Sequence, residues 1–268
     1  MEGYPQFESI LVERHDRILT CTLNRPQSLN AVDDRLHHEL EELFAAIAVD
    51  EETDAVVLTG AGRAFCAGGD VKGMARGELS TARQRPGGLF TRGAVRLIRN
   101  LLSVPQPMIA SLNGDAIGLG ATIALLCDVV LAAEHARIGD PHVKVGLVAG
   151  DGGAVIWPLL VGANRAKEYL MTGDLVAASE AERIGLVNHV YPADQLEAAT
   201  RELAARLANG ATAAIRWTKQ SVNKALWDRM NLILDTSLVL EGLSAATDDH
   251  HEAARAFTER RPPKFTGY

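Results

Sequence analysis

Apolar and polar positions along the first two thirds of the chain predict strands and helices in turn. Residues 9–23 alternate around a polar centre, which is typical of two short strands joined by a turn. Apolar positions recur at helical spacing between residues 32 and 49, and residues 54–59 form a short apolar run that indicates a buried strand. A helix and two strands repeat this order at residues 90–102, 107–112 and 128–133. Strands that alternate with helices predict an α/β layered core.

The pattern changes after about residue 195. Helical periodicity runs through four segments with no strand between them, at residues 195–208, 211–226, 230–246 and 249–260. We therefore divide the chain into a core over residues 1–194 and a helical C-terminal region over residues 195–268. No low-complexity linker joins the two parts, so we expect the helical region to pack on the core or on a neighbouring subunit.

The composition of the chain excludes several classes of function. Its 268 residues, 47% of them hydrophobic, are enough to bury one substantial core. A net charge of −7 argues against nucleic acid as a partner. No apolar run reaches the length of about 18 residues that a membrane span needs, and the first residues do not resemble a secretory signal. We therefore expect a cytoplasmic protein without a membrane partner. The three cysteines, Cys21, Cys66 and Cys127, are too widely spaced for a CxxC pair and are expected to be buried thiols.

Two glycine-rich stretches carry the candidate chemistry. They are TGAGRAFCAGGDVKG at residues 59–73 and NGDAIGLGATIALLCD at residues 113–128, and each is interpreted as a strand, a glycine turn and the start of a helix, the first helix beginning near Asp70. The first N–H groups of a helix have no partner within it and suit a developing negative charge. Two helix ends of this kind that converge would form an oxyanion hole. The alternative interpretation is that the glycines only allow close packing of helices. A dinucleotide fingerprint does not fit, because Phe65 stands where GxGxxG needs a glycine.

The segments AFCAGGDVK, NGDAIGLGATIALLCD and LNRPQSLNA, followed by GLVAGDGG and by residues 159–190, resemble the crotonase (enoyl-CoA hydratase/isomerase) superfamily. The resemblance covers most of the chain. It implies a spiral of repeated ββα units with a C-terminal helical trimerisation region, and hence a homotrimer or a hexamer made of two trimers. It implies an acyl-CoA thioester as substrate, whose coenzyme A arrives with the acyl group, so that no cofactor is permanently bound. The thioester oxygen would accept hydrogen bonds from the backbone N–H groups of Gly69 and Leu119.

The resemblance also implies where coenzyme A is bound. The matching positions around the first strand turn and the first glycine stretch are Arg25, Ala67, Asp70 and Lys72. For Arg25 and Lys72 a solvated surface charge is the alternative. In relatives the tail of one subunit helps to cover the cofactor of another, and Lys264 and Phe265 are candidates for this role here.

The acid–base residues depart from the pattern of the superfamily. Its hydratases use two glutamates, and the matching positions in this chain are Thr122 and His142. A threonine hydroxyl cannot take a proton near neutral pH, whereas a histidine with a nearby carboxylate can exchange one. We therefore predict that His142 and Asp151 form the proton-transfer pair. His142 as a polar residue at a strand end, and Asp151 as a helix N-cap, are the alternatives.

Three functions are consistent with these observations. The first is an acyl-CoA enzyme of the hydratase/isomerase group. The second is a hydrolase that cleaves a carbon–carbon bond of a β-diketone, because the nine-residue spacing of His142 and Asp151 resembles 6-oxocamphor hydrolase. The third is a protein that binds CoA esters without chemistry. No metal is expected, because two adjacent histidine pairs, His37 with His38 and His250 with His251, lack ligand spacing and are interpreted as surface residues.

Overall fold

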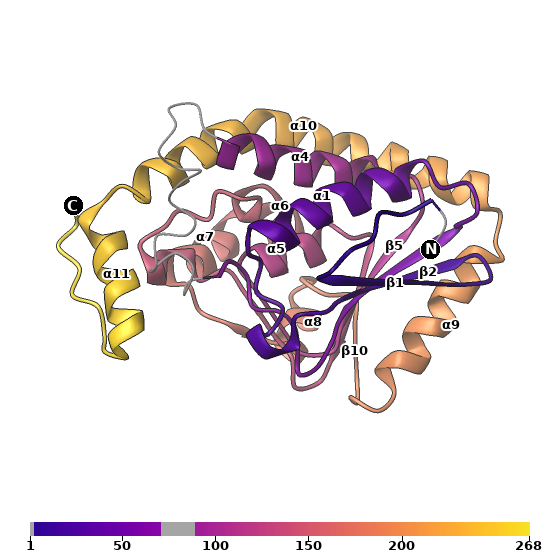
Figure 1. Ribbon diagram of the computed structural model, residues 1–268, viewed down its shortest axis with the longest axis horizontal. Coiled ribbons are helices and arrows are strands. Elements are labelled where there is room, and N and C mark those ends of the chain that lie inside the picture. The colour runs from indigo at the N-terminus through magenta and orange to yellow at the C-terminus, as the bar shows by residue number, and fades with distance from the viewer. Residues whose placement is uncertain (1–2, 71–88) are drawn as a thin grey trace.

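A computed structural model describes residues 3–70 and 89–268 of the chain. The helix expected to begin near Asp70, and Lys72 within it, lie outside the described residues. The described chain builds two β-sheets with helices packed around them (Figure 1).

The larger sheet has six strands and contains every strand predicted from the sequence. Only its first two strands are antiparallel, and the others pair in parallel. Its strands, in spatial order, are β1 (Ile10–His15), β2 (Ile18–Leu23), β3 (Ala55–Gly60), β5 (Met108–Leu112), β7 (Val129–Ala133) and β10 (His189–Tyr191). The middle strands β3 and β5 are buried along almost their whole length because helices cover both faces of this sheet.

A smaller sheet is formed mainly by the strands that follow the central strands of the larger sheet in the chain. Its strands, in spatial order, are β4 (Ala64–Cys66), β6 (Asp115–Ile117), β8 (Arg137–Gly139) and β9 (Val176–Ala177). The strands β4, β6 and β8 run parallel to one another. Because the chain contributes one strand to each sheet before it turns back, the core is a spiral of repeated units.

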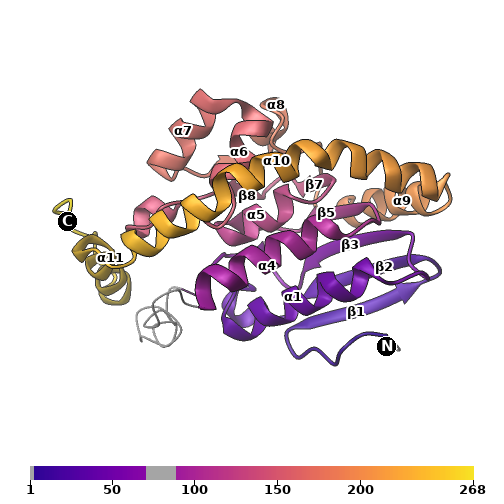
Figure 2. The same ribbon diagram turned by 90° about the horizontal axis from the view of Figure 1, so that it is seen from above.

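The helices of the core follow the glycine turns and the central strands. They are α1 (Asp34–Ala48), α4 (Leu89–Ser103), α5 (Leu119–Leu125), α6 (Gly153–Val161), α7 (Ala163–Thr172) and α8 (Ala178–Arg183), with short 3-10 helices η1 (Pro26–Ser28) and η2 (His142–Val145). The helix α1 begins where the Asp33 carboxylate accepts a hydrogen bond from the Leu36 N–H, and it lies beside α4 (Figure 2). Its buried positions recur every three or four residues, as the sequence predicted.

The C-terminal region is helical, as predicted, but it holds three helices in the part of the chain that the structure describes, not four. They are α9 (Leu196–Ala208), α10 (Thr212–Ser244) and α11 (Asp248–Glu259). The two middle segments merge into α10 because no glycine or proline lies between residues 212 and 241 to end the helix. None of the described helices combines the length and the apolar character that a membrane span requires.

The long helix α10 lies across α4 and α6 (Figure 2), and an ion pair attaches it to the edge of the core. The Lys219 Nζ lies 2.7 Å from Asp128 Oδ2 and donates to the Gln106 carbonyl over 2.8 Å. Burial raises the pKa of Asp128, which the Lys219 ammonium opposes. The side chains of Lys219 and Asp128 are 8% and 22% exposed, so the pair is partly accessible to water.

The main apolar core fills the space between the sheets and the helices, and a smaller cluster lies beneath α9. All three cysteines are free and buried, which confirms the expectation from their spacing. Burial raises the pKa of the Cys66 thiol to about 12, so this thiol stays protonated at neutral pH.

Candidate active site

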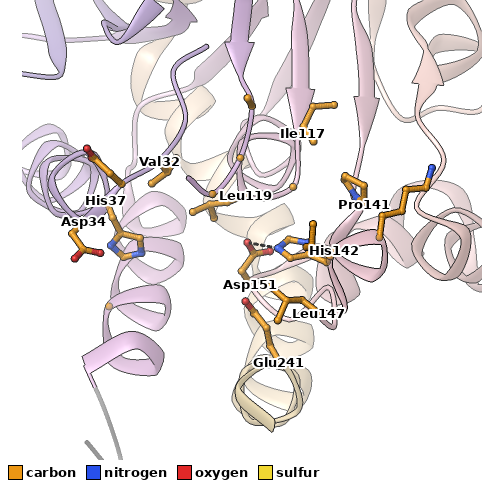
Figure 3. A pocket seen from close by; sticks show the side chains of 18 of the residues that line it. Val32, Asp34, His37, Ile117, Leu119, Pro141, His142, Leu147, Asp151 and Glu241 are labelled. Carbon is orange, nitrogen blue, oxygen red and sulfur yellow. Dashed lines mark ion pairs between the residues drawn. The ribbon is translucent and has the colours of Figure 1, made fainter. Parts of the chain in front are cut away.

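The carboxyl ends of three neighbouring parallel strands meet at one cavity of about 530 Å³. The chain that leaves β4 brings Gly69, the chain that leaves β6 brings Leu119, and the chain that leaves β8 brings His142. Asp151 reaches the same cavity from the loop before α6. The structure thus brings together all four residues that the sequence assigned to the chemistry, and Figure 3 shows three of them around the cavity.

Gly69 and Leu119 each present a backbone N–H at the wall of this cavity. Gly69 forms a parallel bridge with Val32, in which Val32 donates to the Gly68 carbonyl over 2.7 Å and the Asp70 N–H donates to Val32 over 3.1 Å. The hydrogen bonds of this bridge involve Gly68 and Asp70, the two neighbours of Gly69. The N–H of Gly69 therefore points to the opposite side of the strand. Leu119 is the first residue of α5, where a helix has no internal acceptor for the N–H.

Two glycines allow these segments to approach one another. Gly68 has φ +81°, and a Cβ there would lie 2.6 Å from the Ile117 carbonyl oxygen. Gly118 has φ +55°, and a Cβ there would lie 3.4 Å from Cε1 of the His142 ring. The positive φ values and the close approach together require glycine at the two turns, and they place the His142 imidazole directly beside Leu119.

Two other glycines of the second stretch serve packing of the chain on itself. A Cβ on Gly120 would lie 2.6 Å from the Cys66 carbonyl oxygen, and a Cβ on Gly114 would collide with the Arg63 carbonyl. Close packing therefore accounts for Gly114 and Gly120, whereas the oxyanion hole beside Gly68 and Gly118 stays a prediction.

The His142 imidazole lies between two carboxylates. Its Nδ1 forms a short contact with Asp140 Oδ1, and its Nε2 lies 3.5 Å from Asp151 Oδ2. Asp140 is fully buried at the end of β8, and the side chain of His142 is 13% exposed. A ring held at both nitrogens has a fixed orientation, which a proton-transfer group needs.

The two carboxylates also determine the charge of the ring. Burial by itself lowers the pKa of His142, but the negative charges of Asp140 and Asp151 and their hydrogen bonds outweigh it and raise that pKa well above 6.5. The two carboxylates therefore favour the charged form of the His142 ring.

Asp151 is not a helix N-cap. The residue that caps α6 is Gly152, and no side chain accepts a hydrogen bond at that position. The Asp151 carboxylate instead accepts a hydrogen bond from the buried Thr122 hydroxyl over 3.4 Å and faces His142. Thr122 thus contacts the acid–base group without being able to take a proton itself.

A third carboxylate faces the cavity from the C-terminal region. Glu241 of α10 is buried, lines the cavity and lies close to Asp151 (Figure 3). Its carboxylate packs closely against the loop before α6, where a Cβ on Gly150 would lie 2.8 Å from Glu241 Oε2. The cavity therefore combines a cation at His142 with acids from two separate elements.

Asp140, His142 and Asp151 also have ligand atoms within 4.8 Å of one another, a spacing compatible with a metal ion. Both ring nitrogens of His142 face carboxylate oxygens, however, and a nitrogen in that position carries a proton. A metal-ligating imidazole directs a lone pair at the ion and its other N–H at a carboxylate. The arrangement is that of an imidazolium between two acids.

Arg25, a predicted coenzyme A contact, is engaged within the protein. Its guanidinium pairs with Asp33 over 2.7 Å and forms a short hydrogen bond to the Ala31 carbonyl, and its side chain is 18% exposed. The alternative interpretation of Arg25, a solvated surface charge, is therefore wrong. Asp33, its partner, lines the cavity and caps α1, so Arg25 supports the cavity wall from behind.

The other predicted coenzyme A contacts are placed in different parts of the molecule. Ala67 lines the cavity, and Asp70 lies nearby, where its N–H donates to Val32. Lys264 and Phe265 follow α11 and do not line this cavity; the Lys264 N–H instead donates to Glu252 Oε1 over 3.0 Å. Lys72 lies outside the described residues.

One of the histidines interpreted as surface residues is buried, and a second is only partly exposed. His250 is buried, because α11 turns it toward the core, and its Nδ1 lies 2.7 Å from the Val145 carbonyl oxygen. The side chain of His37 is 23% exposed, lines the cavity and pairs with Glu41.

The sequence interpretation missed Asp140, Glu241 and the His37–Glu41 pair. Asp140 had a local signal, since it stands two residues before His142. Glu241 had none, because only the packing of α10 on the loop before α6 brings it to the cavity.

The cavity of about 530 Å³ is lined by Gly69 and Leu119 at the ends of two neighbouring strands and by His142 beside two carboxylates, an arrangement typical of an enzyme site. Comparisons with known proteins agree. The sequence profile of the enoyl-CoA hydratase/isomerase family matches residues 13–268. A probable enoyl-CoA hydratase of Mycobacterium bovis is 36% identical over 97% of this chain and 98% of its own length. The short-chain-enoyl-CoA hydratase of Clostridium acetobutylicum is 34% identical, with 98% of each chain covered.

A solved structure shows the same fold. The crystal structure of an enoyl-CoA hydratase/isomerase from Mycobacterium paratuberculosis has a TM-score of 0.86 and 36% identity, over 94% of this chain and 99% of that one. The chain belongs to the enoyl-CoA hydratase/isomerase family and is an enzyme with the crotonase fold. The predicted α/β spiral with a helical C-terminal region is thereby confirmed.

Proposed function

We propose that the enzyme acts on an acyl-CoA thioester and transfers protons with His142 and Asp151 in place of two glutamates. One observation carries the proposal: His142 lies between Asp140 and Asp151 and also touches the turn that presents the Leu119 N–H. The acid–base group and the site of developing negative charge are thus adjacent. The N–H groups of Gly69 and Leu119 hold the thioester oxygen.

A hydration step balances with these residues. Asp151 takes a proton from water while the water oxygen bonds to the β carbon of an enoyl thioester. The electron pair of the carbon–carbon double bond moves to the thioester oxygen, where the two N–H groups stabilise the enolate. The His142 imidazolium gives its proton to the α carbon, and Asp151 returns a proton to His142 across the 3.5 Å between them. Glu241 orients the water from the side of α10.

Hydrolysis of a carbon–carbon bond in a β-diketone is the second candidate. It is favoured by the buried Asp140 behind His142, because an aspartate that orients a histidine also stabilises the imidazolium that would protonate the leaving enolate. Water would attack the carbonyl carbon and lose its proton to Asp151. The bond to the α carbon would then break, and the enolate that leaves would take a proton from His142.

Steady-state kinetics on two substrates test both candidates. We expect purified enzyme to hydrate crotonyl-CoA, and His142→Ala, Asp151→Asn and Glu241→Gln variants to lose most of that turnover. Turnover of a cyclic 1,3-diketone but not of crotonyl-CoA would contradict the thioester substrate and support hydrolysis of a β-diketone. Turnover of neither, with CoA esters still bound, would contradict both candidates and indicate a binding protein.

We also propose that the C-terminal helices join subunits into a trimer or a hexamer. The helix α10 exposes Leu232, Val239, Leu240 and Leu243, and the chain after α11 exposes Phe265. In such an assembly Lys264 and Phe265 would lie over the cavity of a neighbouring subunit. Light scattering gives the mass directly, and a monomer at micromolar concentration would contradict the proposal.

A further inference from the structure

The cavity has a second polar wall, formed by α1 and α4. His37 and Glu41 lie one helical turn apart on α1, and the His37 Nδ1 lies 3.1 Å from Glu41 Oε1. The other carboxylate oxygen of Glu41 lies 3.0 Å from the Nε of Arg96 on α4. His37, Glu41 and Arg96 all line the cavity that also holds His142.

The helix α4 is shaped to receive this group. A Cβ on Gly93 would lie 3.1 Å from Glu41 Oε1 and 3.2 Å from Cε1 of the His37 ring. A glycine inside a helix lowers helix stability by about 1 kcal/mol relative to alanine. Its position opposite the His37–Glu41 pair therefore indicates that α4 makes room for these two side chains. The Asn100 amide of α4 donates to the Glu41 carbonyl over 2.9 Å, which holds α1 and α4 together at the same level.

The pair fixes the direction of the His37 ring. The side chain of Glu41 is 9% exposed, and its carboxylate oxygen lies 3.1 Å from the Nδ1 of His37, which favours a proton on Nδ1. The Nε2 is on the opposite edge of the ring, and Figure 3 shows the ring at the cavity wall, with Leu119 between it and His142. A carboxylate behind an imidazole sets its tautomer and orientation, as it does in catalytic and metal-binding histidines.

We propose that His37, positioned by Glu41 and Arg96, binds a second oxygen of the substrate, a hydroxyl or a carbonyl on the part of the molecule that extends away from the Gly69 and Leu119 N–H groups. The inference rests on the proposed function, because it takes the first oxygen to be the one at those N–H groups. His37 is a specificity-determining residue in this scheme, and Glu41 is a positioning residue that acts through it.

Calorimetric binding to matched ligand pairs tests this directly. One set consists of acyl-CoA thioesters with a hydroxyl at successive carbons from C3 onward, each compared with its unsubstituted parent. The other consists of cyclohexane-1,3-dione compared with cyclohexanone. Because one hydrogen bond to a buried partner contributes modestly, we expect wild-type enzyme to prefer the oxygen-bearing member of at least one pair by about five- to ten-fold.

The variants separate recognition from a structural role. His37→Gln and Glu41→Gln should each abolish the preference while leaving the affinity for the unsubstituted parent within about two-fold. His135→Gln, which changes an exposed histidine that does not line the cavity, should keep the preference. A wild-type enzyme that shows no preference in any pair, or a His37→Gln variant that keeps it, overturns the inference. Failure to bind any CoA ester overturns only the proposed thioester substrate, because the diketone pair still tests His37.

Discussion

The Cε1 of His142 lies 3.4 Å from the point that a Cβ on Gly118 would occupy, so the acid–base residue packs on the turn that begins α5. Gly118 is followed by Leu119, whose N–H is the predicted donor to the thioester oxygen. In the proposed mechanism, proton transfer and charge stabilisation therefore take place on neighbouring residues of the cavity wall. A displacement of either group would disturb the other.

Removing the Leu119 N–H should slow catalysis without unfolding α5. Leu119 is the first residue of this helix, a position where proline is well tolerated because its missing N–H has no partner in the helix. We expect Leu119→Pro to lower kcat by about 10²–10³, the usual loss for one such donor. Leu119→Ala, which keeps the N–H, should retain most of the rate. Similar rates for the two variants would contradict the role of the N–H.

Asp140 should determine the basic side of the pH profile. Because the pKa of His142 is raised, the imidazolium persists above pH 6.5 and is lost only as the pH rises through the raised value. Asp140→Asn removes one of the two charges that raise it, so kcat/KM should begin to fall at a lower pH. Asp16→Asn changes an aspartate beside the exposed His15 and should leave the profile unchanged. An unshifted profile in Asp140→Asn would show that His142 is not the titrating group.

The ion pair beneath α10 should contribute to stability. Lys219 contacts Asp128 at 2.7 Å, and the side chain of Asp128 is 22% exposed. Lys219→Met would leave a partly solvated carboxylate without its cation, which should cost about 1 kcal/mol of unfolding free energy. Urea unfolding measures the loss, and Lys224→Met on the exposed face of the same helix should be close to neutral. Equal midpoints for the two variants would contradict the prediction.

Asp50 should contribute to acid sensitivity. Burial by itself would raise the pKa of Asp50, but hydrogen bonds from Tyr4, Thr53 and Arg14 and from the Glu52 N–H outweigh it and lower that pKa from 3.8 to about 2. Its side chain is only 8% exposed.

A lowered folded-state pKa stabilises the protein above the unfolded value of 3.8, and this contribution, about 2 kcal/mol, is lost as the pH falls to about 2. Asp50→Asn should therefore unfold at lower denaturant concentration at neutral pH and show a smaller further loss between these two pH values. The exposed Glu51→Gln variant is the control. An unchanged pH dependence in Asp50→Asn would contradict the assignment.

Much of the site was predictable because its residues stand in short segments with a strong local pattern. The glycine turns before Gly69 and Leu119, and the loop from His142 to Asp151, are each readable from a dozen residues. The CoA contacts were less predictable. Arg25 stands at the expected position, but its guanidinium is engaged by Asp33 and the Ala31 carbonyl, and no local pattern reports the direction of a long side chain.

The sequence by itself determined the strands, the helix faces and the order of the repeated units, because hydrophobic periodicity and turn residues act over a few positions. It also indicated four of the residues that we assign to the chemistry. Only the tertiary structure decided that Glu241 reaches the cavity from α10 and that Arg96 of α4 meets the His37–Glu41 pair of α1. These contacts join segments far apart in the chain, and their geometry depends on how helices pack on the two sheets. No local pattern in the sequence encodes that packing. Asp140 and His142 are only two residues apart, but the conformation of the turn after β8 decided that their side chains meet.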